Sequence, residues 1–196
     1  RGVPPVEIAT AMDGLGVYAH QSNPVARLTL GQIKAIYQAD VTNWKELGGR
    51  DAEIILYSRE NNSGTYVFFK DEVLQKEDFA PSCQTLPGTA SVINAVSKDP
   101  NAIGYGGIGY SSGVKVLAVA TNDSTGYFEP TEANVASGKY PLARYLYWYT
   151  AGEPTGDVKK LVDWVLGPEG QKVITEVGYY PLPKKADTTA SAKHDG

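Results

Sequence analysis

The sequence predicts an α/β fold, because apolar runs with strand periodicity alternate with runs of helical periodicity along most of its length. The chain has 196 residues, of which 42% are hydrophobic, enough to bury a substantial core. Strand-like runs cover 6–9, 14–20, 53–57, 114–119 and 140–150. Strands that alternate with helices favour a largely parallel sheet.

Helices are expected between these strands. Thr29 and Gln32 have the spacing of a capping box, and apolar residues follow them at helical intervals. Further helices are expected over 66–75, 90–98 and 158–166, near 132–137, and from Pro168 to about Val177. Trp44 is expected to be buried in a turn. The polar tail that follows Pro183 is predicted to be disordered.

Composition and charge exclude several classes of function. A net charge of −4 provides no global field for nucleic acid or anions, so an anion site must be local and made of oriented dipoles. No apolar run approaches membrane-spanning length. With thirteen Tyr and two His, the chain is poorly equipped for metal or acid–base chemistry, and we expect no cofactor. The single Cys83 excludes an internal disulfide framework.

The most informative segment lies where the strand ending near Tyr57 meets the next helix. It reads Ser-Arg-Glu-Asn-Asn-Ser-Gly-Thr and contains Arg59, Ser63, Gly64 and Thr65. A helix that opens after a Ser-Gly-Thr turn presents free N–H groups, hydroxyls and a positive dipole end to one point. Arg59 adds a planar guanidinium suited to a tetrahedral oxyanion. The segment therefore predicts an anion-binding turn.

A simpler interpretation is also available for each residue near this turn. Ser63 or Thr65 could be only a helix N-cap. Asn61 and Asn62 are possible ligand contacts or could shape the turn, and Glu60 either faces solvent or pairs with Arg59.

Other residues have competing interpretations too. Asp13 precedes a glycine, so it could form a turn or have a hinge or cleft role. The glycine-rich run 103–110 lacks nucleotide-loop spacing, which favours close packing of a strand. The aromatic residues of the run 140–150 are expected in the core and in interlobe packing; these are Tyr145, Tyr147, Trp148 and Tyr149.

Catalysis is not expected. Ser63 has no neighbouring base and no nucleophile elbow, since His20 is remote in sequence and His194 lies in the tail. No set of His, Cys and carboxylate residues has the spacing of metal ligands.

Several short motifs follow one another in order along the chain. They are Asn23-Pro24-Val25, Leu28–Ile33, Asn43–Gly49, Arg59 with Ser63-Gly64-Thr65, Ala102–Tyr105, Ser137–Leu142, Pro168–Gln171, Gly178-Tyr179 and Pro181-Leu182. Their ordered combination resembles the phosphate-binding proteins that deliver phosphate to ABC transporters. The resemblance covers nearly everything from about Val6 to Pro183.

The resemblance implies a type II periplasmic binding fold, with two α/β lobes and a ligand cleft between them. On this interpretation, 1–20 is an outgoing crossing strand, 21–139 the central ligand-binding lobe, 140–182 the returning strand with helices of the first lobe, and 183–196 a flexible tail. The family's opening segment, which carries an acidic residue that accepts the ligand's proton, would precede Arg1. Because Arg1 is not an initiator Met, we expect a processed, truncated or cleaved chain.

The implied function is extracytoplasmic binding of inorganic phosphate, at the cell envelope, for an ABC transporter permease. A missing N-terminal segment or second chain would complete the cleft, and we expect the chain alone to bind phosphate weakly. Alternatives are a binding or sensing module for another oxyanion, a fold retained for a structural role and a phosphoryl hydrolase.

Overall fold

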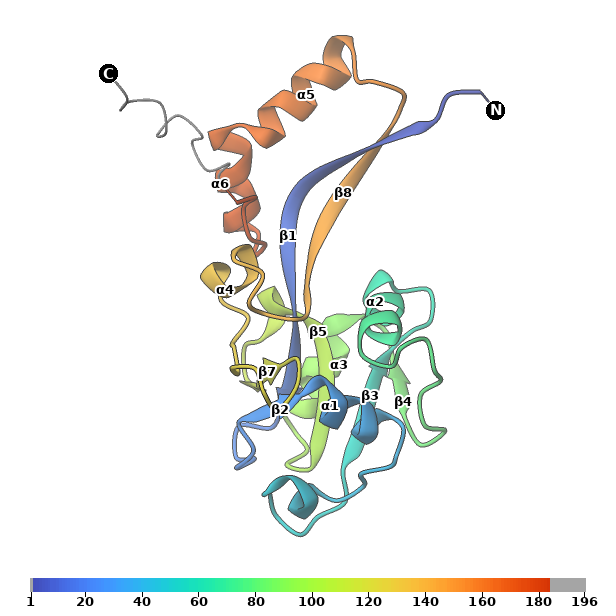
Figure 1. The fold of residues 1–196 in the computed structure, drawn as a ribbon, viewed down its shortest axis with the longest axis vertical. Helices are drawn as coiled ribbons and strands as arrows, with labels where there is room; N and C mark the ends of the chain where they lie inside the picture. Colours follow the sequence, from blue (N-terminus) through green and yellow to red (C-terminus); the bar gives the residue numbers. More distant parts are fainter. Residues whose placement is uncertain (1, 184–196) are drawn as a thin grey trace, which may run out of the picture.

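One long strand, β1 (Pro5–Ala19), runs through both halves of the protein in the computed structural model, which describes residues 2–183 (Figure 1). Its first part pairs with β8 (Ala143–Ala151) to form an antiparallel ribbon. Its last part pairs with β5 (Ala102–Gly107) and β6 (Lys115–Val116) in the main sheet. We call the half below the ribbon in Figure 1 the central lobe and the half around the ribbon's far end the outer part.

The main sheet contains both parallel and antiparallel strands, whereas the sequence predicts a largely parallel sheet. Its strand order is β4 (Gln84–Leu86), β3 (Ile55–Arg59), β5, β1 and β6, with β8 on β1. The strands β4, β3 and β5 are parallel, whereas β1 runs against each strand that it pairs with. A separate parallel pair joins β2 (Arg27–Thr29) to β7 (Ala118–Ala120).

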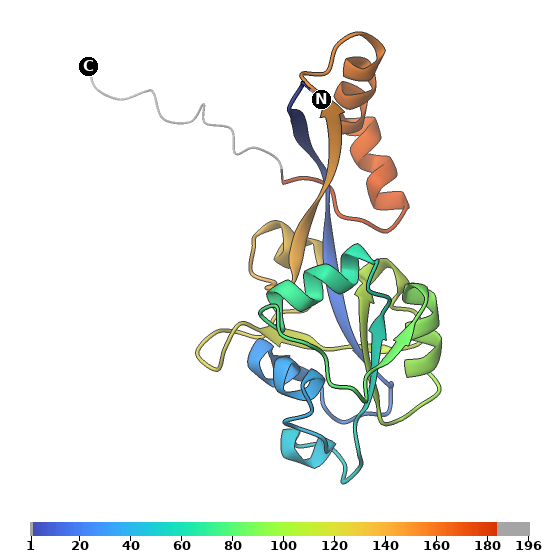
Figure 2. The ribbon, with the colours of Figure 1, turned by 90° about the vertical axis from the view of Figure 1, so that its right-hand side faces the viewer.

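The helices lie close to the ranges expected from the sequence. In the central lobe they are α1 (Leu30–Tyr37), η1 (Trp44–Leu47), α2 (Gly64–Glu72), α3 (Gly88–Val96), η2 (Ile108–Tyr110) and α4 (Glu132–Ala136). The outer part has α5 (Gly156–Leu166) and α6 (Pro168–Glu176), which lie on one side of the β1–β8 ribbon (Figure 2). The capping box of Thr29 and Gln32 is confirmed, and so is the burial of Trp44.

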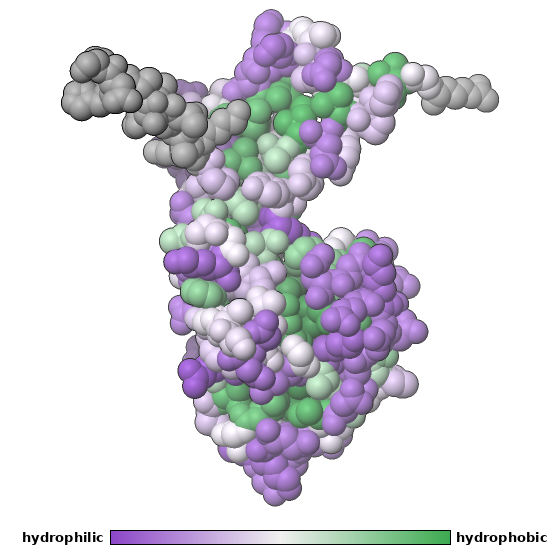
Figure 3. Space-filling view, in the orientation of Figure 1, coloured by the Kyte–Doolittle hydropathy of each residue, from purple (hydrophilic) through white to green (hydrophobic). Residues whose placement is uncertain are grey.

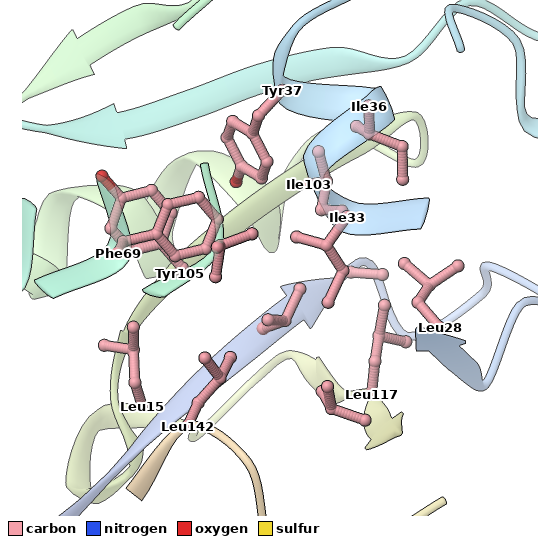
Figure 4. Packing of buried hydrophobic residues seen from close by; sticks show 14 of the residues in the cluster. Leu15, Leu28, Ile33, Ile36, Tyr37, Phe69, Ile103, Tyr105, Leu117 and Leu142 are labelled. Carbon is pink, nitrogen blue, oxygen red and sulfur yellow. The ribbon is translucent and has the colours of Figure 1, made fainter. Parts of the chain in front are cut away.

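The core of the central lobe is built on stacked aromatic rings (Figure 4). Phe69 of α2 lies flat on Tyr105 of β5, with ring centroids 3.8 Å apart, and Tyr37 of α1 meets both rings edge-on. All three side chains are fully buried. Aromatic pairs in these geometries add stabilisation beyond their buried area, so they fix α2 firmly against the sheet.

The glycine-rich run has the packing role that the sequence indicates. A Cβ atom at Gly104 would lie 2.5 Å from Val92 of α3, and one at Gly106 would lie 2.3 Å from Thr89. Only glycine at these positions allows α3 to approach β5 so closely. The beginning of α3 is thereby held next to the end of β5.

The runs 6–9 and 14–20 are strand as expected, and they join in the single strand β1. Two expectations are wrong. The run 114–119 is divided between β6 and β7. The aromatic side chains of β8 are not core residues, because Tyr145, Tyr147, Trp148 and Tyr149 are each 38–63% exposed. Tyr147, Trp148 and Tyr149 line a hollow together with Val158 and Leu161 of α5. Figure 3 shows a green, hydrophobic area on the outer part.

No helix among residues 2–183 is long and apolar enough to span a membrane. The expected flexible tail, 183–196, lies outside the described residues apart from Pro183.

Candidate functional site

A cavity of about 610 Å³ lies where the ribbon meets the central lobe. It is formed where the parallel strands β3 and β5 end and the helices α2 and α3 begin, an edge at which α/β proteins commonly bind ligands. The turn after α6 closes another side. The polar side chains at the cavity from helices and strands come from six elements and are Asp13, Arg59, Thr65, Thr89, Tyr110 and Arg144.

The predicted anion turn contributes to the cavity through Thr65 and Arg59. Ser63 is the N-cap of α2, and its hydroxyl accepts a hydrogen bond of 3.2 Å from the backbone N–H of Thr65. Ser63 and Gly64 do not line the cavity, and Asn61 and Asn62 are exposed outside it. The helix-cap interpretation of Ser63 is therefore confirmed, while contact between these residues and phosphate stays a prediction.

Arg59 is held in place by two partners. Its Nε and Nη2 donate to the carboxylate of Glu60 at 2.9 and 3.2 Å, and its Nη1 donates to Thr89 Oγ1 at 2.8 Å. The Glu60 carboxylate also accepts from the N–H of Gly88, at the start of α3. Of the two alternatives expected for Glu60, facing solvent or pairing with Arg59, the pairing with Arg59 is confirmed. The hydrogen bonds from Arg59 lower the pKa of Glu60 to about 2, so this carboxylate is ionised at neutral pH.

A second arginine, which sequence reasoning missed, also faces the cavity. Arg144 of β8 lies opposite Asp13 of β1 in the ribbon, and its Nη2 and Nε donate to Asp13 Oδ2 at 2.8 and 3.1 Å. Its guanidinium also donates to the carbonyl of Gly64 and to Thr65 Oγ1, each at 3.2 Å. Arg144 therefore connects the ribbon to the first turn of α2.

Asp13 lies in the middle of β1, so the turn interpretation of this residue is wrong. The side chain is 3% exposed. Burial raises the pKa of Asp13 above its ordinary value, although the Arg144 guanidinium acts in the opposite direction. The sequence contains a signal for this pair. One crossing strand carries an acidic residue and the other a basic residue, and the two can form an ion pair if the strands lie side by side.

The charges at the cavity cancel in two pairs. Arg59 is balanced by Glu60 and Arg144 by Asp13. An entering anion would gain little from net charge, so it would depend on hydrogen bonds and on the positive end of α2.

The described residues form no group of three or more His, Cys, Asp or Glu side chains arranged to hold a metal ion. The sole cysteine, Cys83, is partly buried, and burial raises the pKa of its thiol to about 12, so the thiol is protonated at neutral pH.

Comparison with known proteins places the chain in a family. A profile of the PBP superfamily domain matches residues 1–169, and the chain belongs to this superfamily of binding proteins. It is similar to the phosphate-binding protein PstS of Pseudomonas aeruginosa, with 39% identity over 94% of the chain and 62% of the relative. PstS of Bacillus subtilis is 32% identical over 90% of the chain and 58% of the relative. Within the superfamily the chain is PstS-like.

Solved structures agree with this placement. A putative phosphate ABC transporter substrate-binding protein with bound phosphate, from Clostridium perfringens, superposes with a TM-score of 0.79 and 34% identity, covering 91% of this chain and 72% of the other. An ABC-type phosphate transport receptor from Vibrio cholerae gives a TM-score of 0.77 and 27% identity, covering 92% and 73%. The type II periplasmic binding fold is confirmed. The chain spans about three fifths of the length of the PstS relatives.

Proposed function

We propose that this chain is part of an extracytoplasmic protein that binds inorganic phosphate in the cavity and delivers it to an ABC transporter. The observation that carries the proposal is the convergence of Arg59, Arg144 and the first turn of α2 on one cavity between the ribbon and the central lobe. The names of the relatives, which are phosphate-binding proteins, support the choice of ligand.

The same geometry supports binding without a reaction. The Ser63 hydroxyl is engaged by the backbone of α2, and the ring of His20 pairs with Ser22 at the far end of β1. A serine without an oriented base is a weak nucleophile. We propose that the protein does not hydrolyse phosphate esters.

The chain alone supplies part of the contacts that tight binding needs. Micromolar binding requires about 8 kcal/mol. Hydrogen bonds that involve a charged partner contribute roughly 1.5–3 kcal/mol each, and association costs at least about 4 kcal/mol. After the association cost is subtracted, four such contacts leave a binding free energy that only marginally reaches the micromolar requirement. We propose that the range 21–139 forms the ligand lobe and that a segment or chain completing the first lobe strengthens binding.

The test is a calorimetric titration of the chain with phosphate, using Arg59→Ala and a matched control, Arg50→Ala. Arg50 is exposed and donates to the carbonyl of Pro100, away from the cavity. Both variants remove one positive charge. We expect a Kd for the wild-type chain weaker than micromolar, a loss of at least about tenfold for Arg59→Ala, and less than a twofold change for Arg50→Ala.

Two results would contradict parts of the proposal. If Arg59→Ala and the wild-type chain bound phosphate with equal affinity, the cavity would not be the phosphate-binding site. Micromolar or tighter binding by the chain alone at physiological salt would refute the need for a completing segment. Turnover of a chromogenic phosphate ester, lost in Ser63→Ala, would establish an enzyme in place of a binding protein.

A further inference from the structure

The backbone of Arg59 is enclosed by a cycle of three hydrogen bonds that passes through two buried hydroxyl groups. The Arg59 N–H donates to Tyr105 Oη at 3.5 Å, and the Ser58 hydroxyl donates to the Arg59 carbonyl at 3.2 Å. The two hydroxyl oxygens lie 2.8 Å apart. Because the proton of Ser58 is used on the carbonyl, Tyr105 donates to Ser58 Oγ. The cycle therefore begins at the N–H of Arg59 and ends at its carbonyl.

Burial makes this hydrogen-bond cycle a fixed part of the structure. Ser58 is 2% exposed and Tyr105 is fully buried. Burial also raises the pKa of Tyr105 above its ordinary value, so the hydroxyl keeps the proton that it donates. A buried hydroxyl that loses its partner is costly, and hydrogen bonds in sequence polarise one another. The three bonds are therefore expected to form and break together.

The cycle lies where the backbone pairing of the sheet has ended. The pairing of β3 with β5 stops at Leu56 and Ile103. β3 continues to Arg59 and β5 to Gly107, and the two strands form no further backbone pair in the described part of the chain. The Tyr105 hydroxyl spans this gap. A side chain thus takes the place of the sheet ladder at the point where Arg59 reaches the cavity.

The aromatic ring of Tyr105 holds a second component of the cavity. It stacks on Phe69 of α2, with ring centroids 3.8 Å apart and planes at 7° (Figure 4). Phe69 follows Thr65 by four residues, so the two side chains share one face of α2, and both are buried. Thr65 lines the cavity. Tyr105 therefore contacts both the strand that ends at Arg59 and the helix whose first turn carries Thr65.

We propose that Tyr105 is a positioning residue for the anion site, because its hydroxyl holds the backbone of Arg59 and its ring holds the helix face that carries Thr65. This inference rests on the proposed function, which takes these two residues as contacts of the anion. Glu60 and Thr89 fix the guanidinium end of Arg59, and the cycle fixes the backbone from which the side chain extends. Groups that are already in position lose less freedom on binding.

The first test removes the hydroxyl and keeps the aromatic stack, in Tyr105→Phe. Tyr37→Phe is the matched control, because Tyr37 is fully buried in the same aromatic cluster and its hydroxyl donates to the carbonyl of Tyr57 in β3 at 3.1 Å. Each variant removes one hydroxyl that is bonded to β3. In calorimetric titrations with inorganic phosphate, we expect a Kd about three- to tenfold weaker in Tyr105→Phe and changed less than twofold in Tyr37→Phe.

The second test breaks the same cycle from its other member. We expect Ser58→Ala to weaken phosphate binding about three- to tenfold as well. Because either substitution opens the cycle, the double variant Ser58→Ala with Tyr105→Phe should bind within about twofold of the weaker single variant. Effects that multiply in the double variant would show two independent hydroxyl groups and would contradict the cycle.

Hydrogen exchange measures the position of Arg59 without a ligand. Tyr105→Phe removes the acceptor of the Arg59 N–H, so we expect this amide to exchange at least about threefold faster, with the amide of Ile103 in the paired part of β5 unchanged. Tyr37→Phe should leave the Arg59 amide unchanged. Faster exchange at both amides in Tyr105→Phe would indicate a general loosening of the sheet and would overturn a positioning role.

The binding results distinguish failure of this inference from failure of the proposed function. If the wild-type chain binds phosphate and folded Tyr105→Phe and Ser58→Ala bind it equally well, the inference fails and the proposed function stands. An equal loss of affinity in Tyr37→Phe would also overturn the inference, because the loss would then follow from destabilisation of the aromatic core. If the wild-type chain binds no phosphate, the proposed function fails and this inference fails with it.

Discussion

Each arginine at the cavity already has a carboxylate partner before any ligand is considered. Glu60 joins Arg59 to the N–H of Gly88, and so ties the end of β3 to the start of α3. Asp13 and Arg144 connect the two strands of the ribbon in the same way. The pairs fix the direction of both guanidinium groups, and this reduces the ordering that a ligand would have to impose.

The Arg59–Glu60 pair predicts a dependence of stability on pH. The pKa of Glu60 is lowered from 4.5 to about 2 in the folded chain, so the stabilisation from its ionised form is complete above pH 4.5. It is lost as the pH falls from there toward 2. We expect the difference in unfolding free energy between the wild-type chain and Glu60→Gln to be largest near neutral pH and to shrink over this window.

Urea unfolding at a series of pH values measures this difference. Glu72→Gln, at the exposed end of α2, is the control for a general loss of negative charge. A difference between wild type and Glu60→Gln that stays constant from pH 7 to pH 2 would show that the charge of Glu60 does not stabilise the fold.

At the scale of elements, the start of α2 combines a structural and a proposed binding role. Ser63 caps the helix, while Thr65, two residues further on, and the Arg144 guanidinium face the cavity. Losing an N-cap hydroxyl costs about 0.5–2 kcal/mol when alanine replaces it and only a few tenths when glycine does. The two roles can therefore be separated by substitution.

We expect Ser63→Ala to lower the unfolding free energy by about 1 kcal/mol and Ser63→Gly to lower it less, as measured by urea denaturation. Thr29→Ala, which removes the cap of α1 away from the cavity, should have a similar cost to Ser63→Ala. If phosphate affinity falls in Ser63→Ala but not in Thr29→Ala, the cap of α2 serves the ligand as well. A stability of Ser63→Ala equal to that of the wild type would mean that this cap contributes nothing.

Local signals predicted the elements well, because caps and periodicity depend on neighbours in the chain. The capping box at Thr29 and the helix after Ser63 are examples. Local signals do not predict the pairing of strands that are distant in the sequence. Asp13 lies opposite Arg144 only because of the register between β1 and β8, and the two residues are 131 positions apart. Arg144 was missed for this reason. The direction of β1 against β5, which makes the sheet mixed, was missed for the same reason.

At the scale of the whole molecule, the two halves bury very different amounts of their apolar surface. The central lobe encloses the aromatic core around Tyr105. In the outer part, Leu161 and Trp164 of α5 are 52% and 45% exposed, and Tyr149 of β8 is 63% exposed. The sequence pattern of β8 and α5 is that of core elements, whereas several of their large apolar side chains are exposed.

This contrast predicts unequal local stability. Regions with few buried apolar contacts open more easily than a packed core. We expect the backbone amides of α5 to exchange with deuterium at least about tenfold faster than those of β5, as measured by hydrogen exchange at neutral pH. The two helices α1 and α5 provide an internal comparison of buried and exposed helices. Equal protection of α5 and β5 would show that the chain unfolds as one unit.

The length of β1 has a consequence for insertions and deletions. Successive side chains of a strand point to opposite faces, so one added residue between Ala11 and Leu15 would turn Asp13 away from Arg144 and shift the pairing with β5. One irregularity already exists: the register with β8 shifts between Ala9 and Ala11, and the Thr10 carbonyl at that point accepts from Gln171 of α6. The number of residues between this bulge and the sheet is therefore fixed by both halves of the protein, and changes in chain length have to occur in the loops.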